Sequence, residues 1–542
     1  MFLLTWAPLL FLQTPQDNWV CEADLIFQGK PAQHLGWSLS AEGNWNRSET
    51  DQAADILAGS FGVIDEAELF DHVGRVELYL SPYPWAEGST SCPPHQGATG
   101  VRISSAKPAG DRFGQTVSYI GDVDGDDRDD FVVAAVRGPY LEGADEPWPE
   151  NGSLYVFLSS DEGTGFHPDL VSAGTTEASA SDASLIVINS GEGRVGDRLG
   201  TALAAVGDRN GDGTPDFVAG APGSYRSEPN YPGRVYVLSG AAILAAFEAG
   251  QNVVDVHEVS DEVFQGDAKD GVPDRFGYSV AALGDAGGAP GETDFAVGAP
   301  QFTLTPTGLA HKGGHGYVTV FDAQVRVGRR FDGQRPNDRF GFSVGQGANV
   351  GGKDAINELI VGAPLWDLEQ PDGSLVPDIG RVYVYDARTS RSVLPKGVLL
   401  RGLQPGERFG HFVSGIRDVG GSPLGDLVVG SHRANIAQTQ FLPGAFPCQC
   451  DGTSTNPDDL KLGGGSAGSV RIFTRLTAVH SQRFLGESQR DSTGIPTVVA
   501  QGIGPNGEDA MVIGGPRWPD VTEIDGVEVK ESGRVYIFLI DR

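Results

Sequence analysis

Basic residues are scarce in this sequence. Lys and Arg together number 39 against 72 Asp and Glu, which gives a formal net charge of −33 at pH 7. Nucleic acids carry dense negative charge and are bound through clustered basic side chains. The charge balance therefore argues against nucleic acid as a partner.

Long apolar runs are also rare. One occurs at the start, MFLLTWAPLLFL, and it is shorter than the roughly 20 residues of a transmembrane helix. It resembles the apolar region of a secretory signal, although no Lys or Arg precedes it and no small-x-small cleavage site follows. We expect a signal peptide at residues 1–15, no membrane span, and a secreted, periplasmic or cell-surface location. The alternatives are a misassigned start codon or a buried N-terminal segment.

Cysteines are few, and their spacing does not indicate zinc. Cys448 and Cys450 form a CQC pair without a second pair of ligands. Together with Cys21 and Cys92 they fit an oxidising compartment. The triplets at Asn46 (NRS) and Asn151 (NGS) match the glycosylation pattern, which predicts a glycoprotein if the source organism modifies such sites.

The sequence contains none of several common catalytic motifs. The sequence has no nucleophile elbow, no zinc-protease helix motif and no phosphate-binding loop. Its histidines are scattered; His311 and His315 share a loop, where exposure to solvent is the simpler interpretation. We therefore name no catalytic residue and leave enzymatic activity as an open alternative.

Three short apolar elements, rich in Gly and bounded by Gly, Pro or Asp, recur seven times in the same order. The first contains Phe-Gly or a variant, and it begins at His34, Arg112, Arg198, Arg275, Arg339, Arg408 and Ser492. The second is typified by DFVAGAP, and it begins at Asp55, Asp130, Asp216, Asp294, Glu358, Asp426 and Ala510. The third is typified by GRVYV, and it begins at Gly74, Gly152, Gly233, Gly316, Gly380, Gly468 and Gly533.

Each element reads as a β-strand, and a fourth apolar run closes most units. Seven units of four strands predict an all-β fold, a seven-bladed β-propeller spanning residues 16–542. The last unit ends without a fourth strand, whereas ADLIFQG stands before the first unit. We expect this N-terminal strand to close the ring by completing blade seven, which removes an exposed sheet edge.

The order Phe-Gly, Gly-Ala-Pro, Gly-x-Val-Tyr-Val, with acidic loops between the elements, resembles the FG-GAP repeat of the integrin α-subunit propeller. The resemblance covers nearly the whole chain after residue 15. It implies the propeller fold, calcium in the acidic loops and a partner-binding face. We expect no counterpart here of the leg and membrane segments of a full integrin subunit.

Two loops between the first and second strands carry oxygen side chains at matching positions. In blade two these are Asp122, Asp124, Asp126 and Asp130; in blade three they are Asp208, Asn210, Asp212 and Asp216. Position seven would add the backbone carbonyl of Arg128 or Thr214, and Gly125 and Gly211 permit the turn. Calcium takes six to eight oxygen ligands at about 2.3–2.6 Å and tolerates irregular geometry. Because the other blades lack this pattern, we predict two calcium sites; the alternative is a pair of solvated acidic turns.

The second-to-third strand loops lie on the opposite face and carry aromatic residues of the kind favoured at interfaces. The candidate partner-binding residues are Tyr140, Trp148, Tyr225, Tyr231, Trp366 and Trp518. The alternative is that these rings pack against neighbouring loops. The Asp-Arg pairs before Phe-Gly, at Asp111, Asp197, Asp274 and Asp338 with Glu407 as the variant, are expected to form salt bridges between blades.

These observations favour a monomeric, calcium-binding adhesion or binding module whose ligand is a protein or glycan. One alternative is a hydrolase-associated protein, because similar repeats accompany glycosylphosphatidylinositol-specific phospholipase D, whose catalytic part has no counterpart here. Another is a purely structural surface protein. Strand order also places Cys21 and Cys92 on the same face of neighbouring blades, which favours a disulfide between them over one to Cys448 or Cys450.

Overall fold

The fold is taken from a computed structural model of the 542-residue chain. It describes residues 16–19, 23–28, 34–46, 52–60, 74–81, 83, 95–96, 100–105, 110–138, 150–160, 177–190, 195–224, 227, 231–267, 272–284, 293–305, 308–322, 328–345, 349–350, 357–416, 425–433, 468–474, 476, 482–485, 496–515, 522–524, 527–529 and 533–540. Cys21, Cys92, Cys448 and Cys450 lie outside these ranges, so their pairing stays a prediction.

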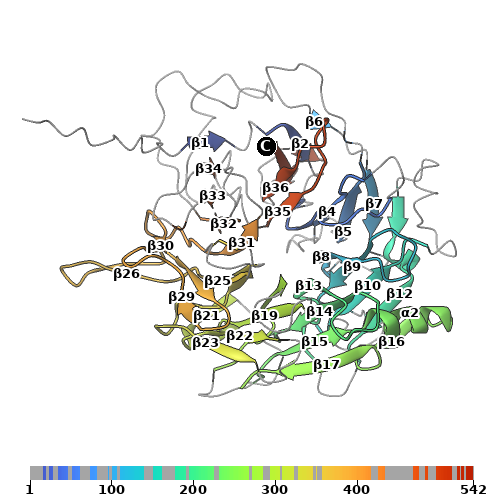
Figure 1. Cartoon of the computed structure of the whole chain (residues 1–542), viewed down its shortest axis with the longest axis horizontal. Helices are drawn as coiled ribbons and strands as arrows, with labels where there is room; N and C mark the ends of the chain where they lie inside the picture. The colour runs from blue at the N-terminus through green and yellow to red at the C-terminus, as the bar shows by residue number, and fades with distance from the viewer. Residues whose placement is uncertain are drawn as a thin grey trace, which may run out of the picture.

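Seven small antiparallel sheets are arranged as blades around a central axis, which confirms the predicted propeller (Figure 1). Blades one to three contain β3 (Ser38–Ser40), β4 (Ile56–Ser60), β5 (Arg75–Tyr79) and β7 (Gly100–Ser104); β8 (Phe113–Gly121), β9 (Asp130–Ala135), β10 (Ser153–Phe157) and β12 (Leu185–Ile188); and β13 (Ala202–Gly207), β14 (Asp216–Ala221), β15 (Arg234–Leu238) and β17 (Ser260–Gln265). Blades four and five contain β18 (Ser279–Gly284), β19 (Asp294–Ala299), β22 (Tyr317–Phe321) and β23 (Arg329–Asp332); and β24 (Ser343–Gly345), β25 (Glu358–Ala363), β28 (Arg381–Asp386), β29 (Arg391–Ser392) and β30 (Leu400–Arg401). Blade six contains β31 (Phe412–Ile416), β32 (Asp426–Ser431), β33 (Ser469–Phe473) and β34 (Gln482–Leu485).

Blade seven closes the ring as predicted. It contains β35 (Thr497–Ala500), β36 (Ala510–Gly515), β39 (Arg534–Leu539) and the N-terminal strand β2 (Leu25–Gln28). Strand β2 pairs antiparallel with β39, with Leu25 opposite Ile537. The two ends of the propeller therefore share one sheet.

Several blades also have a fifth strand, which the sequence analysis did not predict. Four short strands, β1 (Gln16–Trp19), β6 (His95–Gln96), β11 (Glu177–Ser179) and β16 (Val253–Asp255), pair in parallel with the outer strands of blades six, seven, one and two. Each comes from the chain that leads to the outer strand of the next blade. These strands cover an outer edge and tie neighbouring blades together.

Three β-hairpins extend the second-to-third strand connections. They are β20 (Phe302–Thr305) with β21 (Gly308–Gly313), β26 (Leu368–Glu369) with β27 (Leu375–Val376), and β37 (Thr522–Ile524) with β38 (Val527–Val529). Helix is confined, in the described residues, to α2 (Gly240–Glu248) and the 3-10 turn η2 (Ala180–Asp182). No helix found there has the length and apolar character that crossing a membrane requires.

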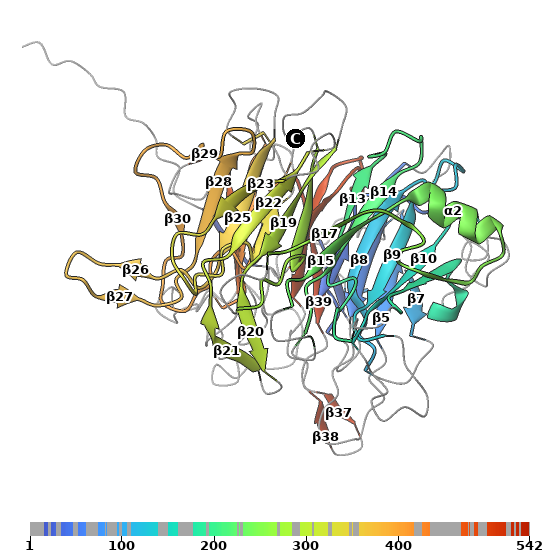
Figure 2. The same cartoon turned by 90° about the horizontal axis from the view of Figure 1, so that it is seen from below.

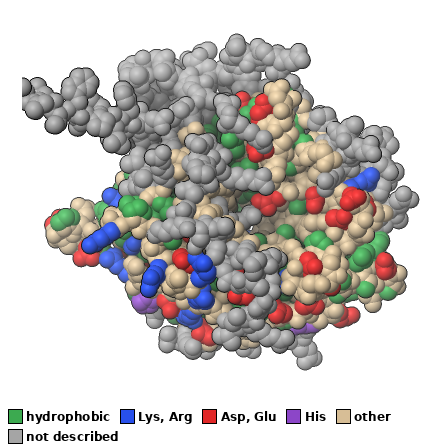
Figure 3. Space-filling view, viewed as in Figure 1, with side chains coloured by type: hydrophobic (Ala, Val, Ile, Leu, Met, Phe, Trp, Pro, Cys, Tyr) green, Lys and Arg blue, Asp and Glu red, His purple; other side chains and the backbone are tan. Residues whose placement is uncertain are grey.

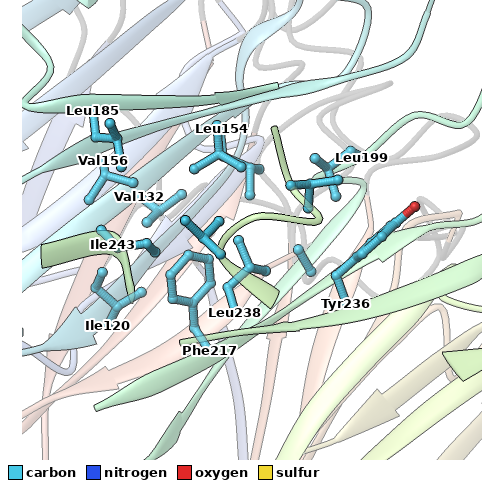
Figure 4. Packing of buried hydrophobic residues seen from close by; sticks show 14 of the residues in the cluster. Ile120, Val132, Leu154, Val156, Leu185, Leu199, Phe217, Tyr236, Leu238 and Ile243 are labelled. Carbon is cyan, nitrogen blue, oxygen red and sulfur yellow. The ribbon is translucent and has the colours of Figure 1, made fainter. Parts of the chain in front are cut away.

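The hydrophobic core lies between adjacent blades. The largest cluster joins blades two and three, and Figure 4 shows Val132, Leu154 and Val156 of blade two close to Phe217, Tyr236 and Leu238 of blade three. All six side chains are fully buried. Ile243 of α2 completes this cluster, so the helix acts as an apolar cover.

Glycines allow the blades to approach this closely. A Cβ placed on Gly298 in the second strand of blade four would lie 2.1 Å from the carbonyl oxygen of Gly341 in blade five. A Cβ on Gly380, which begins the third strand of blade five, would lie 2.2 Å from the carbonyl oxygen of Phe409 in blade six. The same approach to the next Phe-Gly or Leu-Gly element recurs at Gly59, Gly220, Gly362 and Gly514, and at Gly74, Gly152, Gly233, Gly316 and Gly533. Both motif glycines therefore form the seam between blades.

The acidic and basic members of the Asp-Arg pairs have different partners. Asp197 accepts a hydrogen bond from Arg234 of its own blade at 3.1 Å, and Glu407 pairs with Arg471 of its own blade. The following arginine crosses the junction: Arg198 pairs with Glu150 of blade two at 2.6 Å. Salt bridges between blades do form here, but the arginine makes them and not the preceding acid.

We predict that Gly380→Ala destabilises the fold more than Gly397→Ala. Both glycines have φ near +80° (+80° and +83°), so alanine meets similar backbone strain at each, about 1–2 kcal/mol. Only at Gly380 would the methyl group also meet the backbone of the next blade, which adds about 1–3 kcal/mol. Denaturant unfolding measures the difference, and equal losses would contradict the close seam.

Deletion of residues 21–29 is predicted to open the ring. Without β2, the outer edge of β39 is unpaired, so the protein should aggregate or lose cooperative unfolding. Size-exclusion chromatography and thermal melting provide the measurement. Deletion of residues 16–19 is the control, because β1 adds only a fifth strand to blade six; unchanged melting and monomeric elution of the 21–29 deletion would disprove closure.

Candidate functional site

The two acidic loops have the same backbone arrangement. One joins β8 to β9 and the other joins β13 to β14. At position one, Asp122 Oδ1 accepts hydrogen bonds from the N–H groups of Gly125 (2.6 Å) and Asp126 (3.1 Å). Asp208 Oδ1 does the same with Gly211 (2.7 Å) and Asp212 (3.1 Å). The sequence alignment of the loops therefore corresponds to a shared turn.

Positions five and seven also match. Asp126 accepts from the N–H of Arg128 and Asp212 accepts from the N–H of Thr214, both at 2.9 Å. Arg128 and Thr214 thus hold the position-five carboxylate through their backbone. Coordination by their carbonyl oxygens stays a prediction.

The position-nine acid ties the loop to the end of the third strand. Asp130 accepts from the N–H groups of Val123 at 2.8 Å and Ser159 at 2.7 Å. Asp216 accepts from Arg209 at 3.0 Å and from Gly240 at 3.1 Å. Both carboxylates are fully buried.

This position-nine contact also occurs in a blade without an acidic loop. Asp55 of blade one accepts from the N–H groups of Trp45 and Ser81, each at 2.9 Å. The acid before the second strand therefore stabilises the hairpin whether or not the blade has an acidic loop. What distinguishes blades two and three is the oxygen set at positions one, three and five.

In blade two the carboxylates at positions one, three and nine converge, and the group does not include Asp126 of position five. Ligand oxygens of Asp122, Asp124 and Asp130 all lie within 4.8 Å of one another. Asp124 Oδ1 is buried and has no hydrogen-bond partner among the described residues. Burial, followed by the negative charge of Asp124, raises the pKa of Asp130 well above its usual range. A hard cation fits this set, because it would occupy the free oxygen and offset the repulsion.

In blade three the corresponding groups are more open. Asp208, Asn210 and Asp212 are exposed. The Asn210 amide donates to Asp212 at 2.8 Å and to Asp261 of β17 at 2.7 Å, so its nitrogen and not its oxygen faces the carboxylates. Burial raises the pKa of Asp216 to about 6. This loop has the donor types for a cation, but Asn210 must turn to present its oxygen.

The structure adds residues that sequence reasoning missed. Ser159 Oγ donates to Asp126 at 2.8 Å, and Ser160 Oγ donates to Asp124 at 2.6 Å. Both serines follow β10, and Asp261 lies on the fourth strand of blade three. Their only signal in the sequence is their place at strand ends on the same face as the loops.

Of the six predicted partner-binding aromatics, the structure describes two. Tyr231 and Trp366 are buried, at 6% and 5% exposure. Arg234 donates to the Tyr231 hydroxyl at 3.0 Å, and the Arg381 guanidinium lies 5.4 Å from the centre of the Trp366 ring. These two rings pack within the propeller, which agrees with the alternative interpretation. Tyr140, Trp148, Tyr225 and Trp518 lie outside the described residues.

Comparison with known proteins agrees with the repeat pattern. The FG-GAP repeat family model matches residues 199–238, which span the Leu-Gly, Gly-Ala-Pro and Gly-x-Val-Tyr-Val elements of blade three. The chain is an FG-GAP repeat protein similar to integrin α subunits. It is 28% identical to integrin alpha-5 of Xenopus laevis over 232 residues, and 26% identical to human integrin alpha-IIb over 297 residues.

The similarity to integrins covers part of each chain. The two matches span 42% and 54% of this FG-GAP protein, but only 20% and 25% of the relatives. A third match, to mouse integrin alpha-IIb, is 30% identical over 186 residues, 34% of this chain and 17% of the relative. The activities and partners of the whole relatives therefore remain proposals for this chain.

Proposed function

We propose that this protein is a calcium-binding FG-GAP propeller on the outside of the cell that binds a partner protein. The observation that carries the proposal is the pair of matching oxygen-rich loops, with three converging carboxylates in blade two. Similarity to integrin α subunits supports an adhesion or binding role. Asp and Glu side chains are spread over the face viewed in Figure 3.

Calcium suits these loops better than magnesium. Calcium accepts an irregular shell of oxygen ligands, whereas magnesium demands a near-ideal octahedron. Asp122, Asp124, Asp126 and Asp130 would hold the ion in blade two, and Asp208, Asn210, Asp212 and Asp216 in blade three. The bound ion would supply positive charge, which keeps the carboxylates together without repulsion.

The partner face is assigned to the second-to-third loops. Hairpins β20–β21 and β37–β38 project from the side of the propeller opposite to α2 (Figure 2). Three strongly exposed apolar side chains belong to connections on this face: Leu375 in β27 at 55%, Leu403 before β31 at 58% and Val195 before β13 at 51%. Exposed apolar groups among polar loops are typical of protein-binding sites.

Calcium binding is predicted to depend on the carboxylates at position five of the two acidic loops. Asp126→Ala and Asp212→Ala should each remove about one bound ion, and the double variant nearly all binding. At about 1 mM calcium, a site with a dissociation constant near 0.1 mM stabilises the fold by roughly 1.4 kcal/mol. Isothermal titration calorimetry counts the ions, and thermal melting with and without chelator measures the stabilisation.

Two control variants distinguish an effect on calcium binding from an effect on fold stability. Arg128→Ala should leave calcium binding unchanged, because only its backbone is expected to act. Asp55→Asn should lower stability without changing the number of ions, because Asp55 makes the hairpin contact in a blade without the loop. Two ions bound by the double variant would refute the assignment.

Partner binding is predicted to require the apolar residues of the loop face. The Leu375→Asp/Leu403→Asp variant should lose a partner that the unmodified protein captures from the source organism in the presence of calcium. The control is Val253→Asp, which changes an equally exposed side chain (51%) on the outer strand β16. Quantitative capture with each variant is the measurement, and equal loss in both variants would contradict the assigned face.

A further inference from the structure

Five arginines share one position and one unusual backbone conformation. Each immediately precedes the Phe-Gly or Leu-Gly element of its blade, and each has φ between 57° and 59°: Arg112, Arg198, Arg275, Arg339 and Arg408. His34 has the same place and φ 54° in blade one. Left-handed backbone favours Gly, Asn or Asp and is costly for a long side chain. A role for the five arginine side chains is therefore needed to explain why this costly backbone conformation is kept.

These arginines surround the propeller axis. The first strands of all seven blades touch their neighbours around a closed inner ring, as Figure 1 illustrates. The arginines stand at the start of these strands, whereas the acidic loops follow their ends. They therefore lie on the partner face, at its centre; we call these five residues the arginine ring.

The guanidinium groups are close enough to affect one another. Burial and then the charges of Arg198 and Arg137 lower the pKa of Arg112 to about 10. Burial and Arg198 lower the pKa of Arg275 to about 10. Arg275 and Arg339 lie 5.7 and 4.8 Å from the centre of the same Phe302 ring. The ring thus concentrates positive charge in a protein with a net charge of −33.

Few acidic groups oppose this charge in the described part of the chain. The acids that precede the arginines bind elsewhere; Asp274, for example, accepts from Tyr317 at 2.8 Å. The carboxylates that face the ring are Glu150, which pairs with Arg198 at 2.6 Å, and Asp378, whose oxygen is 3.6 Å from Arg408. Glu150 and Asp378 are therefore the carboxylates that pair directly with guanidinium groups of the ring.

Aromatic side chains line the same centre. The residues that follow Phe-Gly in blades four to six, Tyr278, Phe342 and His411, form a continuous row with ring centres 4.9 and 4.8 Å apart. All three are half-buried. His411 Nδ1 and the adjacent Arg408 Nε are buried without a hydrogen-bond partner among the described residues. The Arg408 Nε–H is a donor, so the partner that it lacks is a hydrogen-bond acceptor.

We propose that the arginine ring binds the carboxylates of an acidic segment of a partner protein. Guanidinium groups bind carboxylates through paired hydrogen bonds, and the aromatic row offers apolar contact to the segment's backbone and side-chain stems. A long polyanion is disfavoured because the net charge of the whole protein repels it. A short acidic segment on a neutral or basic partner is not repelled in this way. The inference rests on the proposed function and specifies its ligand chemistry.

The arginines differ in how far the fold depends on them. Arg275 is buried and donates to the carbonyl oxygens of Phe302 at 3.1 Å and Ser224 at 3.2 Å, so it fastens loops. Arg339 is also buried, at 9% exposure, but it lies against aromatic rings, and Arg408 is half-buried with an unsatisfied Nε. Arg339 and Arg408 are therefore the ligand-binding members to test.

The test uses a capped, fluorescein-labelled tetraglutamate peptide and its tetraglutamine counterpart on the full chain. Fluorescence polarisation at low ionic strength should show saturable binding of tetraglutamate only, weakening as salt is added. Arg339→Asn and Arg408→Asn should each lower the affinity at least about tenfold, because each removes a charge-assisted contact. Asn tolerates the left-handed backbone, so melting temperature and calcium binding should be retained.

The matched control is Arg335→Asn, which removes an exposed arginine of the same region paired with Glu369 at 3.2 Å. It should leave peptide affinity unchanged. Absence of saturable tetraglutamate binding, equal binding by the Asn variants, or tighter binding of a sulfated oligosaccharide than of the peptide would each overturn the proposal. Because no natural partner is needed, this assay can fail while the Leu375/Leu403 test succeeds, so the two hypotheses are separable.

Discussion

The close contact between adjacent blades is the constraint on which this propeller depends. The glycines of the second and third strands leave room for the backbone of the next Phe-Gly element, and a Cβ at Gly298 or Gly380 would lie within 2.2 Å of it. Only at this separation can residues such as Val132 and Phe217 share one core. This close contact also brings the first strands together in a tight inner ring. The ring positions the acidic loops at one end of these strands and the arginines at the other. The Gly-rich motif is thus a packing requirement, repeated once per junction.

The two ends of the first strands have opposite electrostatic character. At one end, Asp122, Asp124 and Asp130 converge, and burial raises the pKa of Asp130. At the other end, burial and neighbouring arginines lower the pKa of Arg112 and Arg275. In both places the fold holds like charges together at a cost in free energy. A bound cation at the first and an acidic segment at the second would relieve that cost.

Strand order, ring closure and loop register could all be predicted from the sequence, because local turn residues and a sevenfold repeat specify them. The fifth strands could not, since β6 and β16 depend on the free outer edge of a neighbouring blade. The partners of the Asp-Arg pairs could not be predicted either, because Asp197 pairs within its own blade whereas Arg198 pairs across the blade junction. Aromatic residues in a loop gave equally little guidance, because Tyr231 and Trp366 are buried and contact Arg234 and Arg381 of the third repeat element of their own blades.

The sequence by itself determined which loops carry oxygen ligands and where the turns fall, because both depend on neighbours along the chain. Only the tertiary structure decided which of those oxygens meet. Three carboxylates converge in blade two, where Ser159 and Ser160 approach them, while Asn210 turns its amide toward Asp261 in blade three. Only the tertiary structure brings the arginines of five blades to one axis. Their proximity exists because β2 closes the ring, and no local pattern encodes a distance between residues that belong to different blades.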